Sequence, residues 1–256
     1  MVFKTVDTRL GKIALYEKKV PYTLPLIFLH GVYFDHRLWN YQASQIDDRT
    51  IITIDMPLHG KSKEQVPSQW NLEDCGHMLI DLLEALRIDS AIAVGHSWGS
   101  MTLLRAAHQY PEKFQAVGFC NMPFKATTSQ TKLQFKLQHL LLPFRKFYVQ
   151  QVAKAMFSKQ TIQTKPAAIT YLQESMGLLS NQAIRQTDHY VIVQAEDTSE
   201  KIPVLKMPAL ALKGKEDYVP APETLKTTLV EGGHVSPLEA PEATLAFIYE
   251  VIALVK

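Results

Sequence analysis

The chain has 256 residues, of which 46% are hydrophobic and 20% are charged, and its formal net charge is +2. That length suits one large domain of alternating strands and helices, with room for an insertion and a substantial core. The small net charge gives no general reason to expect a nucleic-acid partner. The first residues, MVFKTVDTRLGK, are interrupted by charges, and no stretch approaches 18 uncharged apolar residues. The sequence therefore predicts neither a signal peptide nor a membrane-spanning segment.

The two cysteines, Cys75 and Cys120, lie in separate apolar segments and have no partner at metal-binding spacing. We expect two reduced, buried thiols, which suggests a reducing compartment. The sequence is thus typical of a soluble, cytoplasmic protein without stable membrane insertion.

Short apolar runs alternate with amphipathic stretches along most of the chain. Eight of the runs are expected to be strands, at residues 2–8, 12–17, 26–29, 50–54, 91–94, 116–119, 209–212 and 227–230. Apolar residues recur at helical spacing over residues 71–88, 101–110 and 242–255. Alternation of this kind predicts βα units and a mostly parallel sheet with helices on both faces.

This alternation stops between residues 123 and 194, where helix-like material rich in Leu, Phe, Gln and Lys contains no clear strand. Residues 123–185 carry nine Lys or Arg against one acid, Glu174, so this segment has a charge of +8 and the rest of the chain −6. We expect residues 123–194 to be a helical insertion with its own surface. Residues 1–122 and 195–256 would then form the core domain.

Residues 94–101 read VGHSWGSM, in which Ser97 lies between Gly95 and Gly99. The bare G-x-S-x-G pattern arises by chance in about one chain in ten of this length, so its context decides its meaning. Here it joins an expected strand to an expected helix, where two glycines allow close packing and expose the serine. The following helix N-terminus also favours a developing anion. We therefore predict that Ser97 is a catalytic nucleophile.

A serine hydroxyl needs a base within hydrogen-bond reach. Of the nine histidines, His234 is the candidate, because its GGH loop between the last strand and the last helix can bend over the strand ends. The base in turn needs a carboxylate that fixes its tautomer. Asp217 follows the expected strand 209–212 and is the predicted acid, with its neighbour Glu216 as the alternative.

Two backbone N–H groups would complete the site as an oxyanion hole. One belongs to Trp98, the residue after the nucleophile. The other is expected in the loop after the third strand, where His30 and Gly31 turn the chain. Val32 is the preferred donor there and Tyr33 the alternative. One such donor contributes about 2.7–4 kcal/mol of transition-state stabilisation.

Six segments in this order resemble those of the α/β-hydrolase superfamily, over essentially the whole chain. They are LHG (29–31), IDMPLHGKS (54–62), VGHSWGSM (94–101), YPEKFQAVGFCN (110–121), MPALALKGKEDYVP (207–220) and GGHVSPLEAPE (232–242). The resemblance implies an eight-stranded sheet with a helical cap inserted after the sixth strand, at residues 123–194. It also implies the chain order nucleophile, acid, histidine, and a hydrolase that uses no metal and no cofactor.

Several differences between this sequence and subgroups of the family narrow the reactions that the resemblance implies. The family's dehalogenases and epoxide hydrolases have an aspartate nucleophile, and Ser97 argues against both. Prolyl iminopeptidases have a similar elbow but a Gly/Pro-rich loop where this chain has GVYFDHRLW. Leu58 replaces the usual glycine of IDMPLHGKS, which suggests an altered pocket shape. The position that holds the acid in some relatives is Asn121, which carries no charge, so Asp217 keeps that role.

The expected insertion would supply the wall that faces the substrate. One stretch of it is crowded with apolar residues: Leu133, Phe135, Leu137, Leu140, Leu141, Leu142, Phe144, Phe147 and Tyr148. Most should pack onto the core domain, and some should line the pocket and favour an acyl or alkyl group. The predicted substrate contacts are His30, Tyr33, Trp98, Leu141, Phe144 and Tyr148, with the Trp98 side chain narrowing the pocket mouth. The basic residues are interpreted as a solvated face, or alternatively as attracting anionic substrates or a membrane surface.

Together these features predict a metal-free serine hydrolase that cleaves small carboxylic esters or lactones with an apolar acyl group. Esterases of medium acyl chains and acyl-homoserine lactonases both fit. A C–C bond hydrolase acting on a diketone and a peroxidase-like enzyme are the other enzymatic alternatives. A receptor or scaffold that keeps the fold without turnover is the non-enzymatic one.

Overall fold

All eight strands of the computed structural model, which describes residues 1–255, belong to one sheet with the order β1-β2-β4-β3-β5-β6-β7-β8. They are β1 (Val2–Thr8), β2 (Gly11–Lys18), β3 (Leu26–Leu29), β4 (Ile51–Ile54), β5 (Ala91–His96), β6 (Phe114–Cys120), β7 (Ala209–Gly214) and β8 (Thr227–Val230). Strand β2 pairs antiparallel with β1 and β4, and every pairing from β4 across to β8 is parallel. The predicted strands and the mostly parallel sheet are confirmed, with bounds that differ by a few residues.

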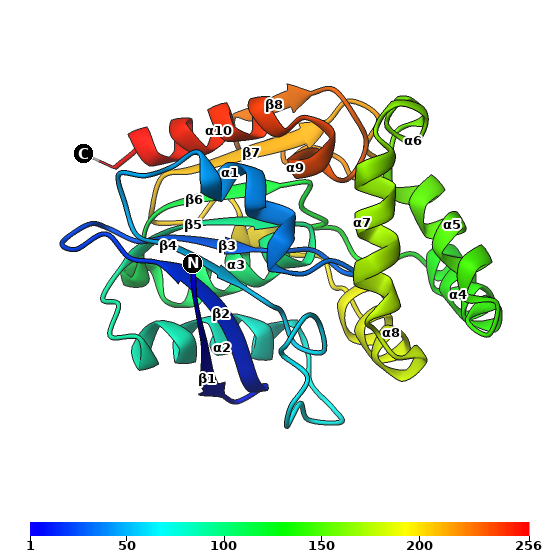
Figure 1. The fold of residues 1–256 in the computed structure, drawn as a ribbon. Coiled ribbons are helices and arrows are strands. Elements are labelled where there is room, and N and C mark those ends of the chain that lie inside the picture. The colour runs from blue at the N-terminus through cyan, green and yellow to red at the C-terminus, as the bar shows by residue number, and fades with distance from the viewer. Residues whose placement is uncertain (256) are drawn as a thin grey trace.

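Helices cover both faces of the sheet, as predicted (Figure 1). Helices α2 (Leu72–Ala85) and α3 (Trp98–Gln109) pack against each other on one face, and α3 contacts β3, β5 and β6. Helices α1 (Asn40–Ser44) and α10 (Pro241–Ala253) lie together on the other face, where α10 contacts β5 through β8. The central strands β3 and β5 are buried along their whole length, which explains their continuous apolar sequences.

Short helical turns connect these elements. They are the 3₁₀ helices η1 (His36–Trp39), η2 (Pro111–Lys113) and η5 (Ser199–Lys201), and the four-residue helix α9 (Ser236–Glu239). Because β3 and β5 to β8 run parallel, the loops that follow them all emerge at the same edge of the sheet. The predicted catalytic residues and oxyanion-hole donors all lie at this edge.

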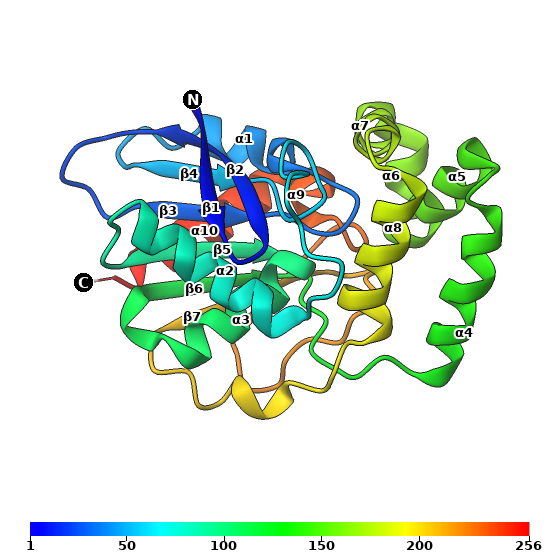
Figure 2. The same ribbon diagram turned by 90° about the horizontal axis from the view of Figure 1, so that it is seen from below.

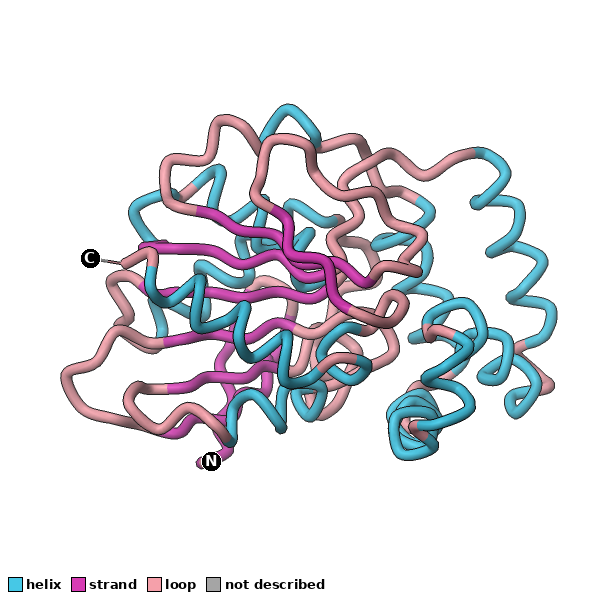
Figure 3. The backbone as a smooth tube through the Cα atoms, turned by 90° about the horizontal axis from the view of Figure 1, so that it is seen from above, coloured by secondary structure: helices cyan, strands magenta, loops and turns pink. Residues whose placement is uncertain are grey.

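The segment between β6 and β7 is helical and contains no strand. Its elements are α4 (Ser129–Gln138), η3 (His139–Leu141), α5 (Arg145–Met156), α6 (Lys159–Thr164), α7 (Pro166–Gly177), α8 (Asn181–Thr187) and the π-helix η4 (Asp188–Val193). These helices gather at one end of the strands (Figure 3), and α4 and α5 form the outer edge, with α7 and α8 between them and the sheet (Figures 1 and 2). Within residues 1–255, no helix combines the length and the apolar character that crossing a membrane requires.

Candidate active site

Ser97 occupies the sharp turn between β5 and α3. Its backbone has φ 50° and ψ −113°, a region that a residue with a side chain seldom adopts and that often marks a functional turn. A Cβ on Gly95 would lie 2.5 Å from the backbone of Gly99, and one on Gly99 would lie 2.4 Å from the carbonyl oxygen of Leu29. Both glycines are therefore required by close packing of backbone on backbone. They allow the sharp turn that places Ser97 between β5 and α3.

The structure brings Ser97, His234 and Asp217 into one hydrogen-bonded chain. His234 Nε2 lies 2.9 Å from Ser97 Oγ, and His234 Nδ1 lies 2.9 Å from Asp217 Oδ1. All three residues are buried. This arrangement allows the imidazole to accept a proton from the serine while the carboxylate fixes the opposite nitrogen as the N–H donor.

The carboxylate of Asp217 is fully hydrogen-bonded. Oδ1 also accepts from the N–H of Val219 at 3.1 Å, and Oδ2 accepts from Asn121 Nδ2 at 2.8 Å. Burial acts to raise the pKa of Asp217, but His234 and these donors outweigh it, so the pKa lies below its ordinary value. The alternative acid Glu216 is exposed to solvent, so its side chain does not occupy this buried position.

Asn121 has a role that the sequence analysis missed. It follows β6 in the left-handed conformation, φ 51°, which asparagine tolerates better than most residues. This turn aims its amide at the carboxylate on the neighbouring strand end, and Nδ2 also lies 3.3 Å from the carbonyl oxygen of Gly233. The sequence feature that could have indicated this role is the position of Asn121 at the carboxyl end of β6, the strand that lies directly beside β7 in the sheet.

The loop that carries His234 is held by the buried carboxylate of Glu239, in α9. Glu239 Oε1 accepts hydrogen bonds from the N–H groups of Gly233 and Val235, at 2.9 and 3.1 Å, on either side of the histidine. Oε2 accepts from the N–H of Ser158, between α5 and α6, at 2.9 Å. One carboxylate therefore joins the loop of the proposed base to the helical segment.

Direct contacts fix His234 further. Its N–H donates to the carbonyl oxygen of Met156 at 2.8 Å, and its own carbonyl oxygen accepts from His96 Nε2 at 2.7 Å. Burial lowers the pKa of His96 to about 3, so this imidazole is neutral at ordinary pH. The ring of Tyr218 stacks on that of His234, with 4.8 Å between the centroids. The imidazole orientation is thus set from several directions.

The loop after β3 passes directly beside Ser97. A Cβ on Gly31 would lie 2.6 Å from Nδ1 of the buried His96 and 3.0 Å from Ser97 Cβ, so glycine is favoured here. The N–H of Tyr33 donates to His59 Nε2 at 3.0 Å and is therefore engaged. Across residues 1–255, the N–H groups of Val32 and Trp98 have no acceptor in the chain. This favours Val32 over Tyr33 as the second donor of an oxyanion hole.

Two predicted substrate contacts, His30 and Trp98, do not face the cavity. His30 is completely buried: its Nε2 accepts from the N–H of Met56 at 2.8 Å, and its Nδ1 lies 2.7 Å from the carbonyl oxygen of Gly31. The Trp98 side chain is also fully buried and stacks on Trp70. Both side chains support the loops around the site, and the prediction that Trp98 narrows the pocket mouth is wrong.

A cavity of about 470 Å³ opens beside Ser97 and His234. Tyr33 lines it as predicted, but Leu141, Phe144 and Tyr148 do not. Phe144 is 69% exposed on the outside of the molecule, Leu141 borders an outer groove, and Tyr148 is buried within the helical segment. These three predictions fail because Leu141 in η3, Phe144 directly before α5 and Tyr148 in α5 all direct their side chains away from the cavity.

The cavity lining combines an apolar and a polar part. Apolar side chains near the serine and the helical segment include Val32, Met101, Phe124, Val152, Met156 and Val191. The polar part comes from the start of the segment and from the inner side of α4: Thr127, Thr128, Thr131, Gln134 and Gln138. The cavity can therefore hold an apolar group and still offer hydrogen bonds at one end.

A second buried polar cluster surrounds Asp188, in η4. Tyr33 donates from its hydroxyl to Asp188 Oδ1 at 2.6 Å, and His139 Nε2 lies 2.7 Å from Oδ2, with the Tyr148 hydroxyl at 3.4 Å. Burial raises the pKa of Asp188, although these hydrogen bonds act in the opposite direction. The cluster links the loop that carries Val32 to three elements of the helical segment.

A family model described as "alpha/beta hydrolase fold" matches residues 25–157. The chain belongs to the α/β-hydrolase family. It is 25% identical to 3-oxoadipate enol-lactonase 2 of Acinetobacter baylyi over 245 residues, covering 90% of this chain and 88% of that protein. It is also 32% identical to an epoxide hydrolase of Caballeronia sordidicola, over 102 residues that are 39% of this chain and 31% of that protein.

The chain thus matches only about a third of the length of that epoxide hydrolase. Among solved structures, a thermophilic esterase from Thermogutta terrifontis superposes with a TM-score of 0.86 over the full length of both chains, at 18% sequence identity. At that identity the likeness is one of fold.

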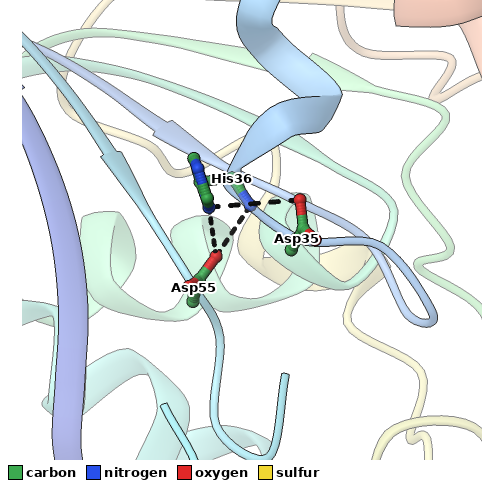
Figure 4. A group of neighbouring side chains, drawn as sticks. All are labelled: Asp35, His36 and Asp55. Atoms are coloured by element: carbon green, nitrogen blue, oxygen red, sulfur yellow. Dashed lines mark hydrogen bonds and ion pairs between the residues drawn. The ribbon is translucent and has the colours of Figure 1, made fainter. Parts of the chain in front are cut away.

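This α/β hydrolase also contains a cluster of Asp35, His36 and Asp55 (Figure 4). Asp55 Oδ1 accepts from the backbone and ring nitrogens of His36, both at 2.8 Å, and Oδ2 accepts from the N–H of Lys61 at 2.8 Å. Asp35 accepts hydrogen bonds from the Arg37 guanidinium through both carboxylate oxygens. Donors of the chain itself occupy these carboxylates, so the cluster is explained as a support for two loops.

Leu58, in the same region as Asp55, is not part of the cavity lining, so its predicted effect on pocket shape is not seen. It adopts φ 68°, the left-handed conformation that glycine adopts without cost. A leucine at this position stores about 1–2 kcal/mol of backbone strain. In this α/β hydrolase, leucine in place of glycine therefore raises the conformational energy of the loop and does not alter the cavity lining.

Proposed function

We propose that this α/β hydrolase cleaves carboxylic esters or lactones through an acyl-enzyme formed on Ser97. The observation that carries the proposal is the hydrogen-bonded chain from Ser97 Oγ through His234 to Asp217, at 2.9 Å for each of its two links. It lies at the end of a cavity large enough for a small substrate.

In the proposed first step, Ser97 Oγ attacks the carbonyl carbon of the bound ester while His234 Nε2 takes the hydroxyl proton. Asp217, kept ionised by its hydrogen bonds, stabilises the imidazolium that forms. The negative charge on the carbonyl oxygen would be received by the N–H groups of Val32 and Trp98. His234 then returns the proton to the leaving alcohol, and the acyl-enzyme remains.

In the second step a water molecule takes the place of the alcohol. His234 accepts a proton from the water as it attacks the acyl carbonyl, and then returns that proton to Ser97 Oγ as the acid departs. A serine suits acyl transfer in particular. Opening an epoxide with a serine would leave an ether, which this base could not hydrolyse, whereas an acyl-serine ester is cleaved by the same machinery that formed it.

We further propose that residues 123–194 act as a cap over the core domain formed by residues 1–122 and 195–256. Supporting this, Met156 and Val191 from the segment line the same cavity as Ser97. The apolar part of the lining favours an acyl or alkyl group, while Thr131 and Gln134 suit a substrate with a polar group at its far end.

A substrate panel tests this proposal. It contains p-nitrophenyl esters of increasing acyl length, simple lactones and acyl-homoserine lactones, each assayed with the wild type and with Ser97→Ala. We expect turnover of at least one ester or lactone series by the wild type and none by the variant. A folded wild type that turns over no member would favour the receptor or scaffold alternative, and cleavage of a diketone alone would favour a C–C bond hydrolase.

A further inference from the structure

The outer side of the helical segment carries an apolar surface that faces solvent. We call the apolar ridge the five residues Leu133, Leu137, Leu140, Phe144 and Phe147, whose exposed fractions run from 48% to 69%. They account for five of the sixteen large hydrophobic residues that are exposed among residues 1–255, within a stretch of fifteen positions. Such clustering marks an interaction site, whereas single exposed hydrophobic residues are ordinary.

The ridge has a regular geometry. Leu133 and Leu137 are four residues apart and share one side of α4, and together with Leu140 of η3 they border a common groove. Thr131 and Phe135 of α4 line the cavity beside Ser97 and do not border this groove, whereas Gln134 borders both. The helix thus exposes Leu133 and Leu137 to solvent, and it lies at the outer edge of the molecule (Figure 2).

Unpaired positive charge accompanies the ridge: Lys136 and Lys146 lie within its stretch of the chain, and Lys154 and Lys159 follow it. Lys136, Lys146, Lys154 and Lys159 are exposed, and none of them has an acidic partner in residues 1–255. Residues 123–185 contain nine Lys or Arg and a single acid, Glu174, which is engaged by Arg37 at 3.3 Å. The partner of this surface must therefore combine apolar and negatively charged groups.

We propose that the α4–α5 side of the molecule docks on an anionic lipid bilayer. The apolar ridge would enter the boundary between headgroups and acyl chains, and the accompanying lysines would contact the negative headgroups. A second copy of this chain is disfavoured as the occupant, because pairing of this side would bring two surfaces with unpaired lysines together. A nucleic acid would satisfy the lysines and leave the leucines uncovered.

This docking goes beyond the hydrolysis proposed above and does not depend on it. It would place α4 between the bilayer and the cavity, so that substrates dissolved in the membrane surface lie one helix away from Ser97.

Co-sedimentation with lipid vesicles tests the proposal. The wild-type protein is mixed with vesicles of phosphatidylcholine alone and with vesicles of phosphatidylcholine and phosphatidylglycerol. We expect sedimentation with the anionic vesicles only, and release as salt concentration rises, since salt screens the lysine contacts. Absence of binding to the anionic vesicles at low salt would overturn the proposal, as would equal binding to both kinds of vesicle.

Matched variants locate the surface. Lys136→Gln with Lys146→Gln should weaken binding about fivefold for each charge removed, since one basic residue near an anionic surface contributes about 1 kcal/mol. Leu137→Ser with Leu140→Ser should weaken it at least about tenfold. The control, Val204→Ser with Lys206→Gln, alters an exposed apolar residue and an exposed lysine outside the segment and should bind as the wild type does.

Hydrolysis of a soluble ester by each variant serves as the check on folding, since none of the substituted residues lines the cavity. If no ester is hydrolysed, far-ultraviolet circular dichroism provides the same check on folding. A failure of the proposed hydrolysis can then be told apart from a failure of membrane docking. Vesicle binding that neither the lysine variant nor the leucine variant weakens would overturn the proposal. So would a concentration-dependent dimer that the leucine variant dissolves, because the occupant would then be a second copy.

Discussion

Asn121 Nδ2 donates a hydrogen bond of 2.8 Å to Asp217 Oδ2, across the ends of the adjacent strands β6 and β7. A neutral residue at the end of one strand thus supports the charged residue at the end of the next. With the hydrogen bonds from Val219 and His234, it keeps the buried carboxylate ionised in spite of its desolvation.

Asn121→Ala should therefore change how stability depends on pH. A carboxyl group whose pKa is lowered on folding adds stability that is present above its unfolded pKa of about 3.9 and lost as pH falls through the folded value. Without the amide the folded pKa of Asp217 rises, so the loss begins at a higher pH. Urea denaturation at pH 7 and at stepwise lower pH measures the free energy of unfolding of the variant and the wild type. A difference in this free energy that stays the same at every pH would contradict the prediction.

Asp217→Asn should lower kcat by up to about 10⁴-fold, because an amide can neither fix the reactive tautomer of His234 nor stabilise its charged form. Glu216→Gln, one position earlier, should leave kcat near the wild-type value because that side chain is exposed. Steady-state kinetics on the best ester of the panel compare the two. If the Glu216 variant lost activity and the Asp217 variant kept it, the assignment of the acid would be wrong.

Glu239→Gln should lower both stability and kcat. The carboxylate accepts three backbone N–H bonds, from Gly233, Val235 and Ser158, and the amide of glutamine would turn a donor toward at least one of them. A buried unsatisfied donor costs about 1–3 kcal/mol, which thermal denaturation can detect. Glu242→Gln, at an exposed position, is the control, and equal melting temperatures for the two variants would refute the role of Glu239.

Asp188→Ala should reduce kcat more than it raises KM. It leaves the Tyr33 hydroxyl and the His139 ring without their buried partner, at a cost of about 1–3 kcal/mol, and loosens the loop that carries Val32. Asp197→Ala removes an exposed carboxylate whose ion pair with Lys125 spans 3.6 Å, and should change little. A change confined to KM would indicate that Asp188 acts on substrate binding alone.

The features that the sequence predicted correctly are local ones. Each strand is a short apolar run, and the glycines around Ser97 are required by backbone contacts within one turn and its neighbouring strand. The loop positions of Asp217 and His234 follow once the strands are placed in order. For these residues a linear pattern and the topology of a parallel sheet suffice to predict that they meet.

The features that it missed depend on contacts between distant segments. Tyr33 and Asp188 meet across 155 positions, and no local pattern marks either of them. The error over Leu141 and Phe144 has a different cause. An apolar run in the sequence does not show which of its residues face the cavity. Leu141 in η3 and Phe144 directly before α5 both lie outside the cavity lining.

The central claim, that Ser97 is the nucleophile, is tested most directly by labelling with a fluorophosphonate. The wild-type protein is treated with the reagent, digested and analysed by mass spectrometry, while ester hydrolysis is followed in parallel. We predict one adduct per chain, located on Ser97, formed at the same rate at which activity is lost, and none in His234→Ala. Labelling at another residue, or full activity in protein labelled at Ser97, would contradict the account.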